Sequence, residues 1–308
     1  MEKENQTSGN EFNITGFYDF PHLRLPLFCA FLLIYLSTLV GNLLIMAIVY
    51  SNKRLHTPMY FFVTNLAFLD ITYTTLIFPK MLAQFFLPGA LISLAGCLIQ
   101  MYFFMAMVST EFLLLGVMAY DRYVAICHPL RYVTIMNEVV CIRLAVGTWM
   151  AGMIDPVPHT VLLSGLSFCG SHTINHFFCD VAAVMKLSCS STRAIEGMSY
   201  LIGIVIGMVP FVLTIISYIN IISTILQIRS TKGRLKTFST CGSHITAVIL
   251  FYVGIISTYM RPTSTFSMKE NKVASLSYVA LTPLCNPIIY SLKNKEFKNT
   301  LRKSKNTT

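Results

Sequence analysis

The stretch "LIQMYFFMAMVSTEFLLLGVMAYDRYVAICHPLRY", residues 98–132, joins a long apolar run to a cluster of charges. Its first part, residues 98–118, contains one charged side chain, Glu111. An α-helix of about 20 residues is about 30 Å long, which is the thickness of the hydrocarbon core of a bilayer. Asp121, Arg122, His128 and Arg131 then follow closely. The pattern predicts a membrane-spanning helix that ends in a charged cluster at the water boundary.

The rest of the chain repeats the apolar half of this pattern. Of the 308 residues, 55% are hydrophobic and only 12% are charged, whereas a soluble domain has about 25% charged residues. Much of the surface therefore faces lipid, and the sequence predicts an all-α membrane protein built as a seven-transmembrane helix bundle. The predicted spans are residues 25–50, 58–84, 94–121, 141–164, 196–227, 237–260 and 271–292. In the fourth of these spans, the run from Asp155 to Pro158 is expected to interrupt the helix.

Charge and glycosylation signals predict the orientation. Fifteen of the 23 lysines and arginines fall in the segments that are cytoplasmic if the N-terminus is outside, in agreement with the positive-inside rule. Residues 1–24 form a polar tail, expected to be flexible and extracellular, with acceptor sequons at Asn5 and Asn13. The transmembrane domain is expected at residues 25–292. The net charge is +10, but the basic residues fall between apolar runs. This distribution argues against a nucleic-acid-binding surface.

The C-terminal segment, residues 293–308, is basic and carries Phe297 and Leu301 four residues apart. This spacing predicts a short amphipathic helix on the anionic inner leaflet, with a merely solvated tail as the alternative. No cysteine follows Cys285, so palmitoylation of this segment is not expected.

Four of the nine cysteines fall at the outer side of the predicted bundle, where disulfides persist. They are Cys97, Cys169, Cys179 and Cys189. Four cysteines allow three pairings. Because three of the four lie in the loop of roughly residues 165–195, this loop is expected to be bonded both to itself and to span 3. The other five are expected to be free thiols.

Two acidic residues, Asp70 and Glu111, lie in the middle of spans 2 and 3. An ionisable group at that depth costs at least about 2.5 kcal/mol, so both should face the bundle interior. Two neighbouring carboxylates ionise together only with a shared cation or proton. With Asn42 and Asn286 as further oxygen ligands, the sequence suggests a site for a small cation, such as sodium, or for a proton. The alternative is a hydrogen-bonded network in which one acid is protonated.

Asp121 and Arg122 are neighbours at the predicted inner end of span 3. Such a pair can close on itself in one conformation and release the arginine in another. Tyr218 in span 5 and His244 in span 6 are candidates to receive it.

Several sequence motifs together resemble those of one protein family. "MAYDRYVAICHPLRY" (118–132), "PMYFFVTNLAFLD" (58–70), "LKTFSTCGSH" (235–244) and "PLCNPIIY" (283–290) resemble those of vertebrate odorant (olfactory) receptors, a rhodopsin-like G-protein-coupled receptor family. The loop "FFCDVAAVMKLSC" (177–189) is similar to the class II, tetrapod-type branch. The resemblance extends over almost the whole chain.

The resemblance implies disulfides Cys97–Cys179 and Cys169–Cys189. It also implies a stimulatory, olfactory-type heterotrimeric G protein as partner, which raises cyclic AMP. The expected G-protein switch consists of Asp121, Arg122, Tyr123, Tyr218, His244, Asn286 and Tyr290.

The ligand pocket is expected in the outer half of the bundle, where helical spacing selects one stripe of span 3. The resemblance turns this stripe inward. The residues predicted to line the ligand pocket come from spans 3 to 7: Met101, Phe104, Met105, Val108, Ser109, Phe112, His159, Ile202, Gly203, Ile206, Tyr252, Ile255, Ile256, Tyr259, Leu276 and Val279. This mostly apolar wall suits a small, volatile, hydrophobic odorant with about one hydrogen-bonding group. Asp155 is expected to make a structural bond to a neighbouring helix rather than to anchor an amine.

Other functions fit the residues less well. No phosphate loop, nucleophile elbow or metalloprotease signature indicates an enzyme. An ion- or proton-handling seven-helix protein would use Asp70 and Glu111 but would want more polar residues in the inner half. A receptor of the same fold for a lipid, small metabolite or peptide is the remaining alternative. His172, His176 and Cys179 have a spacing that suits copper or zinc, but Cys179 is assigned to a disulfide.

Overall fold

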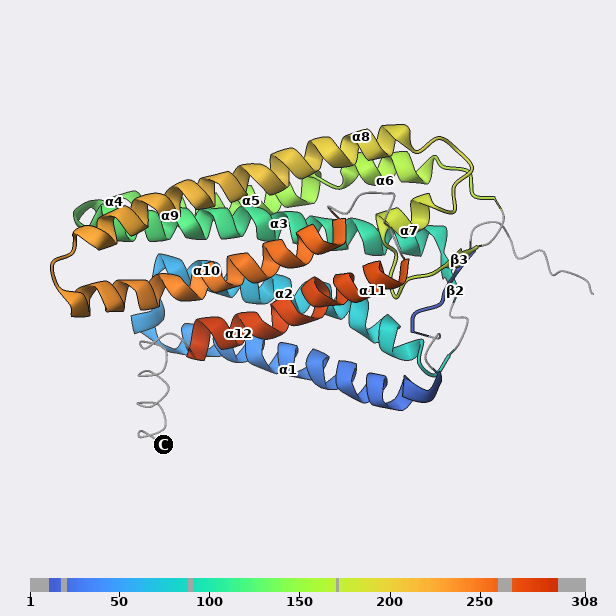
Figure 1. Ribbon diagram of the computed structural model, residues 1–308, viewed down its shortest axis with the longest axis horizontal. Helices are drawn as coiled ribbons and strands as arrows, with labels where there is room; N and C mark the ends of the chain where they lie inside the picture. The colour runs from blue at the N-terminus through green and yellow to red at the C-terminus, as the bar shows by residue number, and fades with distance from the viewer. Residues whose placement is uncertain (1–10, 18–20, 88–90, 170–171, 260–267, 293–308) are drawn as a thin grey trace, which may run out of the picture.

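Seven long helical segments lie side by side in the computed structural model, which describes residues 11–17, 21–87, 91–169, 172–259 and 268–292 (Figure 1). The predicted seven-helix bundle is confirmed. Four of the segments are α1 (Arg24–Ser51), α2 (Pro58–Ala83), α3 (Leu94–Cys127) and α10 (Thr231–Tyr259). The other three are composite: α5 (Glu138–Ile154) with α6 (Val157–Ser164), α8 (Arg193–Ile202) with η4 (Gly203–Met208) and α9 (Val209–Gln227), and α11 (Met268–Leu276) with η6 (Ser277–Leu281) and α12 (Thr282–Leu292).

Short elements connect these segments and distinguish the two ends of the bundle. One end carries β1 (Glu11–Ile14), β2 (Leu91–Ser93), β3 (Thr173–Ile174), η1 (Pro21–Leu23) and α7 (Val181–Met185). Two disulfides also lie there, and we name it the disulfide end. The opposite end, with Arg122, is the arginine end; it carries η2 (Lys53–Leu55), η3 (Pro129–Arg131) and α4 (Tyr132–Ile135).

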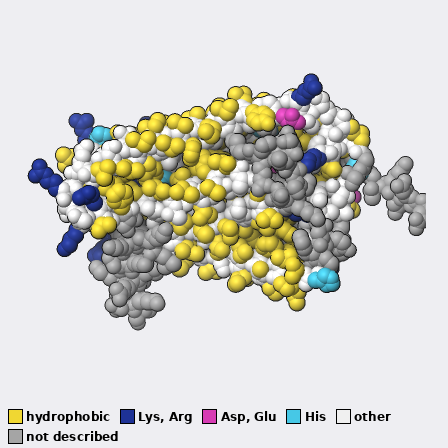
Figure 2. All heavy atoms as spheres, viewed as in Figure 1, with side chains coloured by type: hydrophobic (Ala, Val, Ile, Leu, Met, Phe, Trp, Pro, Cys, Tyr) yellow, Lys and Arg dark blue, Asp and Glu magenta, His cyan; other side chains and the backbone are white. Residues whose placement is uncertain are grey.

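Apolar side chains cover the middle of the bundle surface, as a bilayer requires. Leu33, Val40, Leu213 and Ile219 are examples of large apolar residues that are exposed on the protein alone. Figure 2 shows apolar side chains over a broad band of the visible face, with most visible lysines and arginines gathered at the arginine end. The band is the surface expected to contact lipid tails, where apolar side chains meet hydrocarbon instead of water.

Helix ends follow the local sequence rather than the fall in hydropathy. α3 was predicted to end at residue 121 but continues to Cys127, because residues 122–127 contain no helix breaker and Pro129 comes only after His128. α10 likewise begins at Thr231 instead of residue 237. At their first turns, Ser93 Oγ accepts from the Gly96 N–H of α3 at 3.1 Å, and Asn137 Oδ1 accepts from the Val140 N–H of α5 at 3.0 Å.

The predicted interruption of span 4 is present between α5 and α6, at Asp155 and Pro156. The sequence did not predict the π-helical turns η4 and η6 in spans 5 and 7. Such turns contain one extra residue, which changes the direction of every side chain beyond them.

Two glycines allow close helix packing. A Cβ added at Gly152 of α5 would lie 2.0 Å from Thr110 Oγ1 and 2.9 Å from the Ala106 carbonyl oxygen of α3. A Cβ at Gly254 of α10 would lie 2.7 Å from Cβ of Tyr278 in η6. Both positions therefore bring backbones closer than any larger residue permits.

A three-stranded sheet covers the disulfide end, in the order β2-β1-β3. β1 runs antiparallel to β2, with Phe12 opposite Ile92, and parallel to β3, with Ile14 opposite Ile174. The sequence predicted a flexible N-terminal tail, and for residues 11–14 this is wrong: Phe12 and Ile14 are buried apolar residues that hold the strand in place. Residues 1–10, with the sequon at Asn5, and the predicted amphipathic helix at 293–308 lie outside the described residues.

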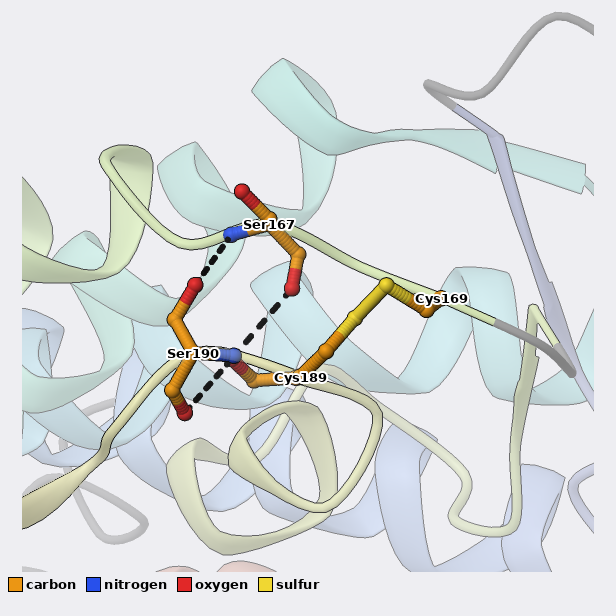
Figure 3. Close-up of a disulfide and its surroundings, with 5 residues drawn as sticks. Ser167, Cys169, Cys189 and Ser190 are labelled. Atoms are coloured by element: carbon orange, nitrogen blue, oxygen red, sulfur yellow. Dashed lines mark hydrogen bonds between the residues drawn. A yellow bond between two sulfur atoms is a disulfide. The ribbon is translucent and has the colours of Figure 1, made fainter.

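Both implied disulfides are present. Cys97 of α3 is bonded to Cys179, with a Cα–Cα distance of 5.4 Å, and Cys169 is bonded to Cys189 at 5.8 Å. Figure 3 shows the second bond between two extended segments: the Ser167 N–H donates to Ser190 Oγ at 3.1 Å, and the Cys189 N–H donates to the Ser167 carbonyl at 3.0 Å. The loop is thus held both to itself and to α3.

Candidate functional site

The predicted pocket residues of α3 point into the bundle. Phe104 and Phe112 are buried in the main core, whereas Met101 packs under the sheet with Phe12. Met105 and Val108 are partly buried beside them. The stripe predicted from helical spacing is therefore an interior face.

The partners from the other helices divide by burial. Tyr252, Ile255 and Val279 are buried, and Ile202, Gly203, Ile206 and Leu276 are partly buried. Ile256 instead lies on the outer surface with 45% of its area exposed. Consecutive helical residues differ by about 100°, so Ile255 and Ile256 cannot both face inward.

Tyr252 of α10 links three helices near the centre of the bundle. Its ring makes an edge contact with Phe112 of α3, with centroids 5.2 Å apart, and packs on Phe211 of α9 at 4.6 Å. Its hydroxyl donates to the carbonyl of Gly207 in the π-helical turn η4 at 3.2 Å. A movement of α10 therefore changes contacts to both spans 3 and 5.

Tyr259, one of the predicted polar groups, contacts an acid in the loop above the bundle. Its hydroxyl donates to Asp180 Oδ2 at 2.8 Å and lies 2.8 Å from the hydroxyl of Tyr278. Because Tyr259 gives its only hydroxyl proton to Asp180, Tyr278 is the donor in the second bond. Asp180 Oδ1 accepts from the Ala182 N–H at 3.0 Å. The contact ties the end of α10 to the disulfide-bonded loop, although 44% of the area of Tyr259 is exposed.

His176 lies in the same loop, and both of its ring nitrogens are buried without a hydrogen-bond partner. The ring stacks on Phe177 at 4.6 Å and meets the edge of Phe178 at 4.7 Å. Burial lowers the pKa of His176 to about 4. The predicted metal spacing of His172, His176 and Cys179 does not provide a thiolate, because Cys179 is bonded to Cys97. No group of three metal-binding side chains occurs among the described residues.

Ser109 and His159, the other predicted polar residues, contact the break in span 4 and the start of span 5. Ser109 Oγ donates to Asp155 Oδ2 at 2.5 Å, which is the structural bond expected for Asp155. His159 Nε2 lies 2.9 Å from Ser199 Oγ of α8. These four residues connect α3, the α5–α6 segment and α8.

Asp70 and Glu111 are both buried, as predicted. Asn286 of α12 donates through Nδ2 to both carboxylate oxygens of Asp70, at 3.0 and 3.3 Å, and the Tyr73 hydroxyl donates at 3.4 Å. Both carboxylate oxygens of Glu111 are buried without a hydrogen-bond partner. The hydroxyl of Thr282 and Oδ1 of Asn42 are also buried without one. Glu111 interacts electrostatically with Asp70, so the two acids are neighbours across α2 and α3.

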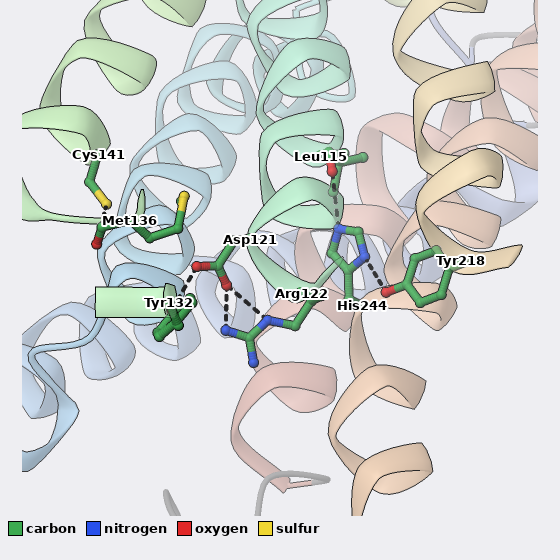
Figure 4. A network of polar contacts seen from close by, with 8 residues as sticks. All are labelled: Leu115, Asp121, Arg122, Tyr132, Met136, Cys141, Tyr218 and His244. Atoms are coloured by element: carbon green, nitrogen blue, oxygen red, sulfur yellow. Dashed lines mark hydrogen bonds and ion pairs between the residues drawn. The ribbon is translucent and has the colours of Figure 1, made fainter. Parts of the chain in front are cut away.

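At the arginine end, Asp121 and Arg122 form a closed ion pair (Figure 4). Arg122 Nε donates to Asp121 Oδ2 at 2.9 Å, and Nη2 donates to the same oxygen. The Tyr132 hydroxyl of α4 donates to Asp121 Oδ1 at 2.8 Å. Burial and the nearby Asp121 carboxylate raise the pKa of Tyr132, so its hydroxyl keeps the proton that it donates. Tyr132 was not predicted, because nothing in its local sequence marks it as a partner of Asp121.

Tyr218 and His244 bond to each other in this conformation rather than to Arg122 (Figure 4). His244 Nε2 faces the carbonyl of Leu115 at 3.2 Å, so this nitrogen carries the proton. His244 Nδ1 then accepts from the Tyr218 hydroxyl at 2.7 Å. Spans 3, 5 and 6 are therefore joined by one tautomer of one histidine.

The remaining predicted switch residues lie elsewhere. Tyr123 is paired with His128, hydroxyl to Nε2 at 3.1 Å. Asn286 belongs to the Asp70 cluster. Tyr290 is buried, and its hydroxyl has no hydrogen-bond partner. Its electrostatic neighbours include both Asp70 and Arg122, so it lies between the two clusters.

Gln100 and Asp180 are site residues that the sequence analysis missed. Gln100 Nε2 donates to the Leu76 carbonyl of α2 at 3.2 Å, and its Oε1 accepts from the Cys179 N–H at 3.1 Å. It therefore positions the disulfide-bonded loop over α2 and α3. Its polar side chain in a predicted span was the available signal.

Comparison with known proteins gives consistent matches over almost the whole chain. A family model described as "Olfactory receptor" matches residues 31–305. Olfactory receptor 1L4 of Homo sapiens is 47% identical over 304 residues, covering 98% of this chain and 98% of that relative. Olfactory receptor 1G1 of Gorilla gorilla gorilla is 46% identical over 303 residues, covering 98% and 97%. Olfactory receptor 5AR1 of Mus musculus is 44% identical over 303 residues, covering 98% of each chain.

Proposed function

The chain belongs to the olfactory receptor family, and from this premise we propose that it binds a small, mostly hydrophobic, volatile odorant in the half of the bundle nearer the disulfide end. The family is one of receptors and not of enzymes. Binding activates a stimulatory, olfactory-type heterotrimeric G protein at the arginine end and raises cyclic AMP. The observation that carries this proposal is the closed Asp121–Arg122 pair, held by Tyr132 beside the Tyr218–His244 bond.

The proposed orientation places the N-terminus and the disulfide end outside the cell. Two disulfides at one end favour the oxidising side of the membrane. The exposed basic residues Lys53, Arg54, Arg131 and Arg229 at the other end favour the cytoplasm. Asn5 and Asn13 are then proposed glycosylation sites in the plasma-membrane protein. Asn13 lies in β1, the central strand of the sheet, with Oδ1 buried, so a glycan on its Nδ2 has to be accommodated on a face of the sheet.

The proposed mechanism is a shift between two populations. An odorant that binds the active arrangement more tightly than the resting one favours it by the difference in binding free energy. Contacts to Tyr252 and Tyr259 transmit ligand binding to α10. His244 lies on the same helix, so a movement of α10 breaks its bonds to Tyr218 and Leu115. Arg122 then leaves Asp121 for the G protein.

We also propose that Asp70 and Glu111 share a sodium ion or a proton. Support comes from the two unpartnered carboxylate oxygens of Glu111, which are buried one helix away from the Asp70–Asn286 pair. A positive charge there satisfies both acids, since two adjacent carboxylates do not ionise together cheaply.

Substitution of Arg122 tests the proposed switch. Arg122→Ala should abolish odorant-stimulated cyclic AMP in a reporter cell while the receptor remains at the cell surface, because the group that engages the G protein is lost. Tyr132→Phe should have the opposite effect. It removes one hydrogen bond of about 1 kcal/mol from the closed state and should raise basal cyclic AMP several fold.

Arg143→Ala is the matched control, because Arg143 is an exposed arginine of α5. Surface expression is measured with an antibody to an N-terminal tag on intact cells. Normal signalling by Arg122→Ala, at equal surface expression, would show that the switch is assigned to the wrong residues.

A further inference from the structure

Four polar side chains form a compact group where spans 3, 4 and 5 meet. We name it the acceptor cluster: Ser109 of α3, Asp155 at the break between α5 and α6, His159 of α6 and Ser199 of α8. Ser109 Oγ donates to Asp155 Oδ2 at 2.5 Å, and His159 Nε2 lies 2.9 Å from Ser199 Oγ. His159 is 1% exposed.

The positions of the protons in this cluster follow from its bonds. Ser199 Oγ donates its one hydroxyl proton to the carbonyl of Ile195 at 2.8 Å. His159 Nε2 must therefore be the donor to Ser199, because two lone pairs do not form a hydrogen bond. In the neutral ring the proton is then on Nε2, and Nδ1 is a bare acceptor. His159 Nδ1 is buried and has no hydrogen-bond partner.

Asp155 adds a second acceptor next to the first. It lies four residues before His159, on the same side of the α5–α6 segment, and its charge acts on the imidazole. An ionised carboxylate has acceptor positions for about four hydrogen bonds, and among the described residues only Ser109 donates to the Asp155 side chain. Asp155 and His159 Nδ1 are thus two neighbouring acceptors, and Ser109 donates to the first of them. Leaving a buried acceptor unsatisfied is unfavourable, so the region favours a group that brings protons.

The cluster borders the proposed odorant pocket. Ser109 lies on the inward stripe of α3 with Phe104 and Phe112. Gly203 follows Ser199 by one helical turn, and a Cβ added there would meet no other atom within 4 Å. The space next to Gly203 is therefore open one helical turn from Ser199.

We propose that the acceptor cluster is a subsite for the hydrogen-bond donor of the ligand, so that the receptor prefers alcohols, phenols or primary amines to ethers, esters and hydrocarbons of the same shape. This inference rests on the proposed odorant-binding function and specifies its ligand class. The donor group, a hydroxyl or an ammonium, lies between Asp155 and His159 Nδ1, and the apolar remainder lies along Phe104, Phe112 and Tyr252. The charge of Asp155 favours the ammonium, while His159 Nδ1 serves both.

The test uses sets of compounds that share a skeleton and differ in one group. Full-length receptor in a cyclic AMP reporter cell is exposed to octanol, octylamine, octanal and octyl methyl ether, and to benzyl alcohol, benzylamine, benzaldehyde and benzyl methyl ether. In each set that activates the receptor, the alcohol or the amine should be more potent than the ether by roughly tenfold or more. This is the effect expected of one buried hydrogen bond to a charged acceptor.

Asp155→Asn separates a binding role from a structural one. The asparagine amide can itself donate to His159 Nδ1, so the advantage of the alcohol over the ether should fall by about tenfold while the potency of the ether stays constant. The amine should lose more than the alcohol if the charge contributes. Glu196→Gln is the matched control, because Glu196 is an exposed acid of α8 bonded to Thr192; it should leave both ratios unchanged.

A second variant keeps the subsite testable if Asp155→Asn folds poorly. Ser109→Ala removes the one protein donor to Asp155 and should increase the advantage of the alcohol. Equal potency of alcohol and ether in the unaltered receptor, or ratios that neither variant changes, would overturn the subsite. Silence of every compound, with receptor at the surface and a responsive control receptor, would overturn the proposed odorant-binding function and the inference with it.

Discussion

Single buried polar residues with too few partners mark the places where this receptor can respond to a ligand. Glu111 has two unpartnered carboxylate oxygens, His159 has an unpartnered Nδ1, and neither nitrogen of His176 has a partner. Each such group is costly to bury. Each is therefore a position where a cation, a proton or a ligand donor lowers the free energy, and each can be tested by one substitution.

Glu111→Gln tests the proposed cation. If Asp70 and Glu111 share sodium, replacing sodium by choline in the medium should change agonist potency of the unaltered receptor by roughly fivefold, within the usual range of coupling between sites. The variant should be insensitive, because a neutral amide removes half of the negative charge. The measurement is an agonist dose–response curve at two sodium concentrations.

Glu196→Gln serves as the control, since it removes an exposed carboxylate outside the cluster. If the unaltered receptor itself ignores sodium, a shared proton replaces the ion as the explanation. A sodium response that persists in Glu111→Gln would remove Glu111 from the site.

The sequence identified these residues by type and depth but not by partner. Asp70, Glu111 and Arg122 were predicted because a charge within an apolar run is easily recognised. Asp180 and Tyr132 were missed, because their bonds to Tyr259 and Asp121 join segments far apart in the chain or on opposite sides of a turn. Periodicity reports the face of a helix and not what lies opposite that face, so such pairs require the fold.

At the scale of the elements, all seven spans were predicted, but their ends and the two π-helical turns η4 and η6 were not. Hydropathy measures where lipid ends, whereas a helix ends where its backbone is stopped, as at Pro129 after α3. The break at Asp155–Pro156 was foreseen from its prolines. The π-helical turns η4 and η6 have no comparable marker, and they explain why a constant helical period is unreliable across spans 5 and 7.

The packing of α5 on α3 gives a prediction at this scale. Gly152→Ala should destabilise the receptor by about 1–3 kcal/mol, because its Cβ would overlap Thr110 and the Ala106 carbonyl. Gly147→Ala in the same helix should be neutral or stabilising by up to about 1 kcal/mol, because no atom lies within 4 Å of its added Cβ. Melting temperature of the purified receptor and surface expression provide the measurements. Similar losses in both variants would contradict the close contact.

Over the whole molecule, the two ends differ in how they are held. The disulfide end combines a three-stranded sheet, two disulfides and the Tyr259–Asp180 bond, which connect α10 and residues 11–17 to the same loop. The arginine end depends on a few side-chain hydrogen bonds. The first end can therefore remain ordered while the second rearranges, which suits a protein that binds at one end and signals at the other.

The stability of the disulfide end should depend on pH through His176. Its pKa is lowered from 6.5 to about 4 by burial, with Asp180 and Lys272 as the charged neighbours. The unfolded loop therefore takes up a proton before the folded one does, and stability falls as pH decreases from about 6.5 to about 4. At pH 5 the loss should be roughly 2 kcal/mol relative to neutral pH. His176→Phe, in a position already packed by Phe177 and Phe178, should abolish this loss.

Melting of the purified receptor at neutral pH and at pH 5 measures the effect, expected as a decrease of a few degrees. His172→Phe is the control, because His172 is only partly buried in the same loop. An equal decrease in the His176 variant would assign the pH dependence to other groups.

The sheet at the disulfide end also sets an order for biosynthesis. The ribosome makes β1 early, yet Thr15 finds its partner Asn175 only 160 residues later, and Gly16 meets Lys272 after 256. Phe12 has its neighbour Ile92 once β2 is made, but Ile14 lacks its neighbour Ile174 until β3 is made. A nascent chain that stops before residue 173 therefore lacks β3, and its sheet stays incomplete until the second half of the chain is made.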